Sequence, residues 1–326
     1  MNKFRRQTLL KIASLPAAIS FANFASAQAW PDKALRIYLG LAPGGGADVA
    51  VRLIADGLRE RLGQAVVVEN VSGAGGTIAS ARVAAARPDG YSFEAKTIST
   101  AVIAPMVYKS LPYKAVEDFK PVGMIARAPL VAVVSNRVPA QDLQSLLALL
   151  KAEPGKHTYG SSGVGTVLHL AGELFKRAAG VDIRHVPYRG NAPALQALLA
   201  GDISMSFDTI GQVMPHIQAG RLKAVGVASN TPTRLMPNLV PMGNVVPGCA
   251  IDTWIGIYAP AATPAPVIDE MSRALNFVLQ QRAVSERLSA LSWETSTSTP
   301  EEFGRFWRAQ IDTLGPLIKS LNIEAA

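Results

Sequence analysis

Apolar residues in this chain follow two alternating patterns. Short apolar or β-branched runs are each followed by a longer segment in which apolar residues recur every three or four positions. In 47–62, for example, one helical face carries Ala50, Leu53, Ile54 and Leu58, and Gly63 follows as a stop signal. The pattern predicts strands at 35–41, 65–69, 91–95, 130–134, 156–159, 183–186, 204–207 and 223–228, and helices at 47–62, 77–86, 143–152, 166–179, 192–200, 211–219, 266–280 and 300–319.

Strands separated by helices of this length favour parallel pairing with right-handed crossovers. We therefore predict an α/β protein of two lobes, each a mostly parallel sheet flanked by helices. The predicted boundaries are 28–127 plus 229–326 for lobe 1 and 128–228 for lobe 2, with the two C-terminal helices packed back on lobe 1. The chain would cross between the lobes near 125–130 and near 225–230.

Residues 1–27 have the features of a signal peptide for export. A basic start is followed by an apolar stretch and by Ala-Ser-Ala at 25–27, which is an A-x-A cleavage site. The pair Arg5–Arg6 resembles a twin-arginine signal, but Thr8 stands where such signals usually have a bulky apolar residue, so the general secretory route stays open. We expect a periplasmic mature protein; the alternative is a buried N-terminal helix.

Charge and composition argue against several functional classes. The segment 1–27 carries four positive and no negative charges, so its removal lowers the formal net charge from +8 to +4. No run of Lys or Arg remains to mark a nucleic-acid surface, and no later segment predicts a membrane span. The single cysteine, Cys249, indicates no internal disulfide. The four histidines lack metal-ligand spacing, so we expect neither a metal nor a cofactor.

Two glycine-rich loops each lie between a predicted strand and a predicted helix. The first loop, 42–48, reads A-P-G-G-G-A-D, and the second loop, 160–166, reads G-S-S-G-V-G-T. Glycine lets a ligand approach main-chain amides, and the helix behind each loop adds about half a positive charge at its N-terminus. Because ligands of open α/β sheets bind at the carboxyl ends of strands, we predict one anion, most simply a carboxylate, held by both loops. The candidate contacts in these loops are Pro43, Gly44, Gly45, Gly46, Asp48, Ser161, Ser162, Gly163, Gly165 and Thr166.

Each loop also has an interpretation without a ligand. The first is then a plain helix cap in which Asp48 complements the helix dipole, and the second is a flexible surface turn. In the ligand interpretation, Asp48 holds the loop, meets an ammonium group or acts through water. A β-branched residue at Gly45 is expected to keep the ligand away from the loop. We read the third glycine-rich stretch, 71–76, as a tight turn.

Other side chains at the ends of predicted elements are further candidates. Tyr188 and Arg189 follow a strand and are placed to close over a ligand, although Arg189 reads equally well as a solvent-exposed side chain. Asp208 ends another strand, where it either contacts the ligand or caps the next helix. We read His169, in the first turn after the second loop, as a packed and hydrogen-bonded histidine rather than a ligand contact.

Enzyme signatures are missing from the chain. Gly-x-Ser-x-Gly and a Walker loop are absent, and G-x-G-x-x-G fails at its final position, where Leu168 stands. The remaining enzyme hypothesis is an exported serine hydrolase that uses Ser161 or Ser162, with His169 or His185 as the base.

Seven segments together resemble one protein family. They read A-P-G-G-G-A-D (42–48), V-E-N-V-S-G-A-G-G (68–76), P-D-G-Y (88–91), Y-G-S-S-G-V-G-T-V-L-H-L-A-G-E-L-F (159–175), H-V-P-Y-R-G (185–190), H-I-Q-A-G-R-L (216–222) and W-I-G-I-Y-A-P (254–260). In their combination the chain is similar to the Bug-type periplasmic solute receptors, the binding components of tripartite tricarboxylate transporters. The resemblance covers nearly the whole mature chain.

The resemblance implies a non-enzymatic receptor with the periplasmic-binding-protein, or Venus flytrap, architecture. Such a receptor closes on a small organic acid and delivers it to integral-membrane transporter subunits; we expect it to be a monomer. The resemblance also implies that both loops hold a carboxylate, partly through water, and that Asp208 and the segment from Thr97 to Thr100, with Ser99, line the pocket. A receptor that signals to a partner without transport fits the same sequence. Residues 40–42, Val71 and 96–99 depart from the usual family pattern, so the ligand is not implied.

Overall fold

The computed structural model describes residues 30–321 and 323, and the predicted signal peptide lies outside these described residues. The strands are β1 (Leu35–Leu39), β2 (Val66–Asn70), β3 (Ser92–Thr97), β4 (Phe119–Ser135), β5 (Thr158–Ser161), β6 (Arg184–Pro187), β7 (Met205–Thr209), β8 (Leu222–Val227), β9 (Asp252–Pro260) and β10 (Glu294–Thr295). The α-helices are α1 (Gly46–Leu62), α2 (Thr77–Ala84), α3 (Ala104–Val107), α4 (Leu143–Ala152), α5 (Val167–Ala179), α6 (Asn191–Ala200), α7 (Ile210–Gln218), α8 (Ala265–Gln280), α9 (Arg282–Ala290) and α10 (Pro300–Ser320). Short helical turns lie at η1 (Ala74–Gly76), η2 (Ser99–Ile103) and η3 (Met242–Asn244). Among these helices, none is both long and apolar enough to cross a membrane.

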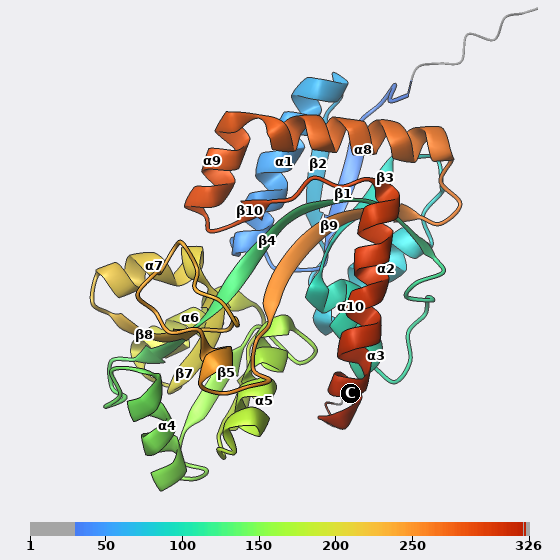
Figure 1. Cartoon of the computed structure of the whole chain (residues 1–326). Coiled ribbons are helices and arrows are strands. Elements are labelled where there is room, and N and C mark those ends of the chain that lie inside the picture. Colours follow the sequence, from blue (N-terminus) through green and yellow to red (C-terminus); the bar gives the residue numbers. More distant parts are fainter. Residues whose placement is uncertain (1–29, 322, 324–326) are drawn as a thin grey trace, which may run out of the picture.

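The strands form one sheet that passes through both lobes. Their order is β2-β1-β3-β9-β4-β7-β5-β6, with β8 and β10 also paired to β4. The first part of β4, 119–129, pairs with β9, and its last part, 130–135, pairs with β7 and β8. In Figure 1, β4 and β9 run as long ribbons between an upper lobe, which holds α1, α8 and α9, and a lower lobe, which holds α4, α5, α6 and α7. The two-lobed α/β architecture predicted from the sequence is therefore present.

The pairing in the middle of the sheet differs from the mostly parallel arrangement that we predicted. The pairs β1–β2, β1–β3, β5–β6 and β5–β7 are parallel, as expected. The pairs that involve β4 or β9 are antiparallel. The apolar pattern predicted only 130–134 of β4, because Pro121, Gly123 and Pro129 interrupt it and two irregularities in its register with β9 break its periodicity.

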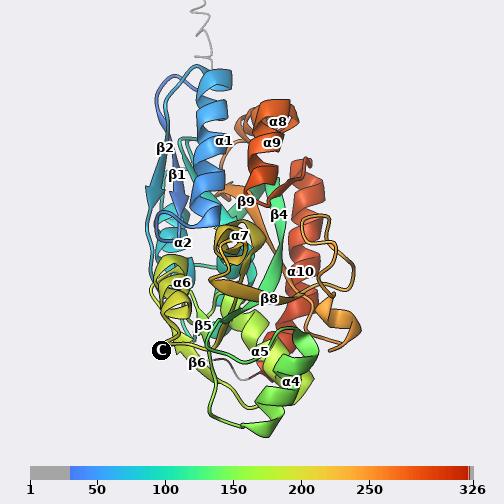
Figure 2. The same ribbon diagram turned by 90° about the vertical axis from the view of Figure 1, so that its left-hand side faces the viewer.

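Helices cover both faces of the lobe 1 sheet. On one face, α1 and α8 pack with β1 residues such as Ile37, and Gly57 permits this approach, since a Cβ there would lie 2.5 Å from Val278 Cγ1. On the other face, α10 contributes Phe303 and Trp307, which pack on Tyr258 of β9. Figure 2 shows α1 and α10 on either side of β4 and β9.

Lobe 2 has the same layered arrangement. Helices α4 and α5 pack on one face of its strands, and α6 and α7 pack on the other. The segment that follows β8 packs back on that strand: Val227 pairs with Pro241, and Met242 covers Gly226. The buried free Cys249 belongs to the same core cluster as Met242. The lobe boundaries given above stay a prediction.

Candidate ligand-binding site

The first loop is held by the Asp48 carboxylate. Asp48 is 4 % exposed and accepts hydrogen bonds from Gly44 N (3.0 Å), Arg52 Nε (3.1 Å) and Asn70 Nδ2 (2.9 Å). Asn70 Nδ2 also donates to Leu41 O at 3.0 Å. Burial opposes ionisation of Asp48, but the hydrogen bonds from Arg52, Gly44 and Asn70 outweigh burial and lower its pKa. Of the roles considered for Asp48, the structure supports holding the loop.

The three glycines of the first loop have different roles. Gly44 has φ 86°, a conformation that favours glycine. Gly45 has φ −77° and ψ 163° as the N-cap of α1, and a Cβ there would meet no atom within 4 Å. A side chain at Gly45 therefore has room within the protein, and its expected effect on ligand approach stays a prediction. A Cβ at Gly46, in contrast, would lie 3.4 Å from Thr209 Oγ1 and from Trp293 Nε1.

The second loop is shaped by its own hydroxyl groups. Ser161 is fully buried; its Oγ lies 2.7 Å from His185 Nε2 and donates to Gly163 O at 3.1 Å. Thr166 is the N-cap of α5, where its Oγ1 accepts from His169 N and donates to Gly163 O at 2.7 Å. Gly163 and Gly165 both have positive φ, 129° and 76°. Ser161 and Thr166 are therefore occupied in building the loop.

Two stacked histidines lie beneath this loop. The rings of His169 and His185 are 3.9 Å apart, and Tyr159 stacks on His185 at 4.8 Å. Burial lowers the pKa of each histidine to about 4, so both are neutral at physiological pH. His169 Nδ1 accepts from Gly165 N at 3.4 Å, as expected for a packed histidine. This stack supports the loop from inside.

The contact of Ser161 with His185 does not form a hydrolase site. Ser161 has no exposed surface and is not among the residues that line the cavity between the loops. Ser162 does line that cavity, and the described residues give its hydroxyl no histidine partner. Among the described residues, no three His, Cys, Asp or Glu side chains lie close enough together to hold a metal ion.

The two loops open onto one shared cavity of about 50 Å³. Gly46 and Ala47 line it from the start of α1, and Ser162, Val167 and Leu168 line it from the second loop and α5. A hydrogen bond joins the two sides of the cavity, because Val167 N donates to Ser99 Oγ at 2.8 Å. The first amides of a helix have no intrahelical acceptor, so those of Gly46 and Ala47 are available to a ligand. The remaining lining residues are Leu41, Thr97, Ser99, Leu130, Asn191, Thr209, Thr253 and Trp293.

Trp293 is a cavity residue that sequence reasoning missed. It lies between α9 and β10, and no periodicity or motif marks it as a site residue. Both Trp293 Nε1 and Thr97 Oγ1 are buried without a hydrogen-bond partner in the structure. Because both residues line the cavity, these two groups are candidates for hydrogen bonds to a ligand there.

Asp208 lies one layer behind the cavity wall. It is 3 % exposed, and its Oδ1 accepts from Thr209 N at 2.8 Å and from Asn191 Nδ2 at 3.1 Å. Thr209 and Asn191 line the cavity, whereas Asp208 itself does not. Burial raises the pKa of Asp208 to about 7, although these hydrogen bonds oppose the shift.

Tyr188 and Arg189 are not among the residues that line the cavity. Tyr188 is half-buried and packs with the apolar residues of lobe 2, and Arg189 is exposed. The neighbouring Gly190 is close to lobe 1, because a Cβ there would lie 3.2 Å from Ala42 Cβ. Pro43, Gly44 and Gly45 likewise stand outside the lining. The ligand contacts of all the candidates stay a prediction.

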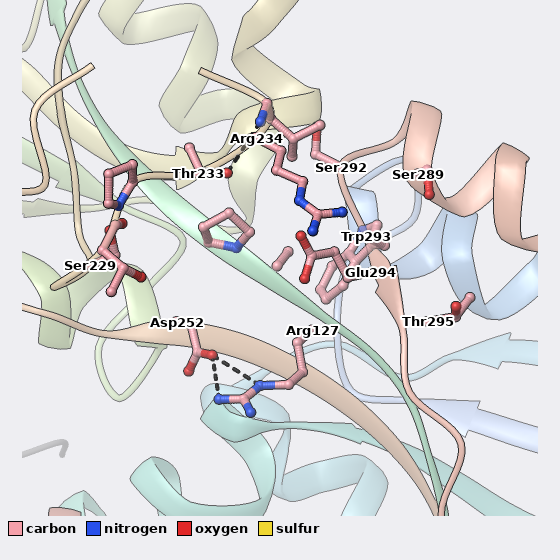
Figure 3. Close-up of a pocket in the computed structure, with 15 residues that line it drawn as sticks. Arg127, Ser229, Thr233, Arg234, Asp252, Ser289, Ser292, Trp293, Glu294 and Thr295 are labelled. Carbon is pink, nitrogen blue, oxygen red and sulfur yellow. Dashed lines mark hydrogen bonds and ion pairs between the residues drawn. The ribbon is translucent and has the colours of Figure 1, made fainter. Parts of the chain in front are cut away.

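A larger hollow of about 760 Å³ lies beside β4 and β9. Figure 3 shows it with the ion pair between Arg127 Nη2 and Asp252 Oδ2 (2.6 Å), and with Arg234 and Glu294 directed toward each other. Trp293 reaches both hollows. No residue of either glycine-rich loop lines the larger one, so we place the candidate ligand site in the smaller cavity.

The sequence pattern of the tripartite tricarboxylate transporter family receptor matches residues 50–323. The chain belongs to this family. Members of this family are periplasmic solute-binding receptors, so the chain is a Bug-type receptor and not an enzyme. This receptor is 32 % identical over 320 residues to a UPF0065 protein of Bordetella pertussis (strain Tohama I), covering 97 % of this chain and 98 % of the relative.

Solved structures share the fold of this receptor. A periplasmic transporter is 38 % identical with a TM-score of 0.86, covering 91 % of this chain and 99 % of that one. The periplasmic binding protein BugD is 30 % identical with a TM-score of 0.85, at 90 % and 99 % coverage. An R. palustris protein solved with adipate is 29 % identical (TM-score 0.86; 90 % and 98 %), and MatC from Rhodopseudomonas palustris, with bound malate, is 28 % identical (TM-score 0.83; 89 % and 100 %).

Proposed function

We propose that this receptor binds a small carboxylate-bearing organic acid between its lobes in the periplasm and delivers it to a tripartite tricarboxylate-type membrane transporter. The observation that carries the proposal is the cavity shared by the N-termini of α1 and α5. Amides at two helix N-termini favour an anion. The ligands of similar proteins, adipate and malate, are carboxylates as well.

The hydrogen bond from Val167 N to Ser99 Oγ, across the cavity, supports this function. Ligand contacts with both lobes favour the closed state by the difference in affinity between the two states. In our proposal Gly46 and Ala47 donate from lobe 1, and Ser162 and Leu168 donate from lobe 2. The protein acts as a monomer that is exported by the signal at 1–27.

A thermal-shift screen with small carboxylates and their uncharged amides tests the binding step. We expect one or more carboxylates to raise the melting temperature and the matching diamides to leave it unchanged. Equal stabilisation by the uncharged amides, or none by any carboxylate, would contradict the proposal. Uptake of the labelled ligand by cells with and without this receptor separates transport from a purely signalling receptor.

A further inference from the structure

The positive potential of the cavity comes from helix N-termini. None of its described lining residues carries a charged side chain. Besides α1 and α5, two more helices begin there: α6 starts at Asn191, and α7 follows its N-cap Thr209. Because each helix N-terminus is equivalent to about half a positive charge, the four together supply about two. Asp48, in the first turn of α1, forms an ion pair with Arg52, so this pair adds no net charge.

The Asp208 carboxylate offsets part of this potential. It lies at the start of both α6 and α7, where it accepts hydrogen bonds from Thr209 N and from the side chain of Asn191. When ionised, it cancels about one of the two positive charges. What remains is enough for one carboxylate. A second carboxylate in the closed cavity would be a buried charge without a partner, which is costly.

The unpartnered polar groups indicate what the ligand carries besides its carboxylate. Trp293 Nε1 is a donor only, and Trp293 is 1 % exposed; Thr97, with its unpartnered Oγ1, is 3 % exposed. A buried donor without an acceptor is destabilising, and a ligand acceptor in the cavity removes that cost. The group that satisfies Trp293 is a hydrogen-bond acceptor and, by the charge argument, one without a full negative charge.

We propose that this cavity selects short monocarboxylates whose other end carries a neutral hydrogen-bond acceptor, with Trp293 donating to that acceptor and Asp208 disfavouring a second carboxylate. The proposal rests on the function proposed above and narrows its ligand class. The size of the cavity, about 50 Å³, agrees with a short ligand, because the cavity has room for only about three to five water-sized groups.

Three probes of matched shape test the proposal by calorimetry at pH 8. Malonamate has one carboxylate and an amide, malonate has two carboxylates, and isovalerate has one carboxylate and an apolar end. We expect malonamate to bind at least about tenfold more tightly than malonate and about fivefold more tightly than isovalerate. Malonate binding as tightly as malonamate would overturn the charge argument, and equal binding of isovalerate would overturn the role of the acceptor.

Two tryptophans provide a matched pair of variants. Trp254 Nε1 is also buried without a partner, but Trp254 does not line the cavity. Trp293→Phe should weaken the binding of malonamate about fivefold and leave the binding of isovalerate unchanged. Trp254→Phe should alter neither affinity. Asp208→Asn should bring the affinity for malonate to within about threefold of that for malonamate, because the partial positive charges at the N-termini of α6 and α7 are then no longer offset. Thermal unfolding of each variant checks that it is folded.

The outcomes separate this inference from the proposed function. If no carboxylate of any length binds, the proposed function fails. Suppose that carboxylates bind, but malonate and malonamate bind with equal affinity, or Trp293→Phe still prefers malonamate to isovalerate as strongly as the unmodified protein does. Only the present inference then fails. If longer acids bind and all three probes do not, the cavity is not the size of its ligand and the inference fails as well.

Discussion

Gly46→Ala is the substitution that most directly tests the shared cavity. Gly46 is the first residue of α1 and does not have positive φ, so alanine fits its backbone. The new methyl group would lie 3.4 Å from Thr209 Oγ1 and Trp293 Nε1 and 3.5 Å from Gln212 Nε2, which are ordinary contact distances. The fold should therefore accept it. Because Gly→Ala at a compatible site restricts the unfolded chain, we expect the free energy of unfolding to rise by about 0.4–1 kcal/mol.

Ligand binding should respond in the opposite direction. The methyl group takes about one water-sized volume from a cavity of about 50 Å³, which is between a fifth and a third of its room. It also lies on the residue whose amide is proposed to donate to the ligand. We expect affinity for the tightest acid found in the screen to fall at least about tenfold, which corresponds to about 1.4 kcal/mol.

Gly45→Ala is the matched control for this variant. Gly45 has an extended backbone, and a Cβ there would meet no atom within 4 Å. The affinity of Gly45→Ala for the same acid, measured by calorimetry, should equal that of the unmodified protein. Chemical denaturation reports the stability of both variants. Unchanged affinity in Gly46→Ala, or an equal loss in both variants, would refute the placement of the ligand against Gly46.

Three further predictions follow from the loops and the closed state. Asp48→Asn should lower the free energy of unfolding at pH 7 by about 1–3 kcal/mol in urea titrations; because the pKa of Asp48 is lowered on folding, the difference from the unmodified protein should vanish as pH falls through that pKa. Ser99→Ala removes the acceptor of Val167 N, so small-angle scattering should show a more open molecule and calorimetry an affinity loss of about twofold to tenfold. His169 and His185 have pKa values near 4 in the fold against 6.5 when unperturbed, so the melting temperature should fall as pH drops from 6.5 toward 4, and a flat profile would contradict their burial as neutral rings.

Much of the fold could be predicted because its signals are local. The helical spacing and the glycine stop placed α4 at the residues where the structure has it and α1 within one residue at its start. The same reasoning identified the strand, loop and helix order of both glycine-rich loops. It missed β9, whose antiparallel return beside β4 does not produce the alternation of strand and helix that we followed.

The site divides in a similar way. The sequence by itself determined that two amide-rich loops precede helices, because glycine content and helix starts depend on neighbours along the chain. Only the tertiary structure decided which groups face the cavity. Ser162 lines the cavity, whereas Ser161 is buried beneath the loop. Asp208 lies behind Asn191 and Thr209, and Trp293 comes from the distant C-terminal part to lie beside Gly46. Contacts between residues so far apart in the chain depend on how the lobes close and pack, and no local pattern encodes them.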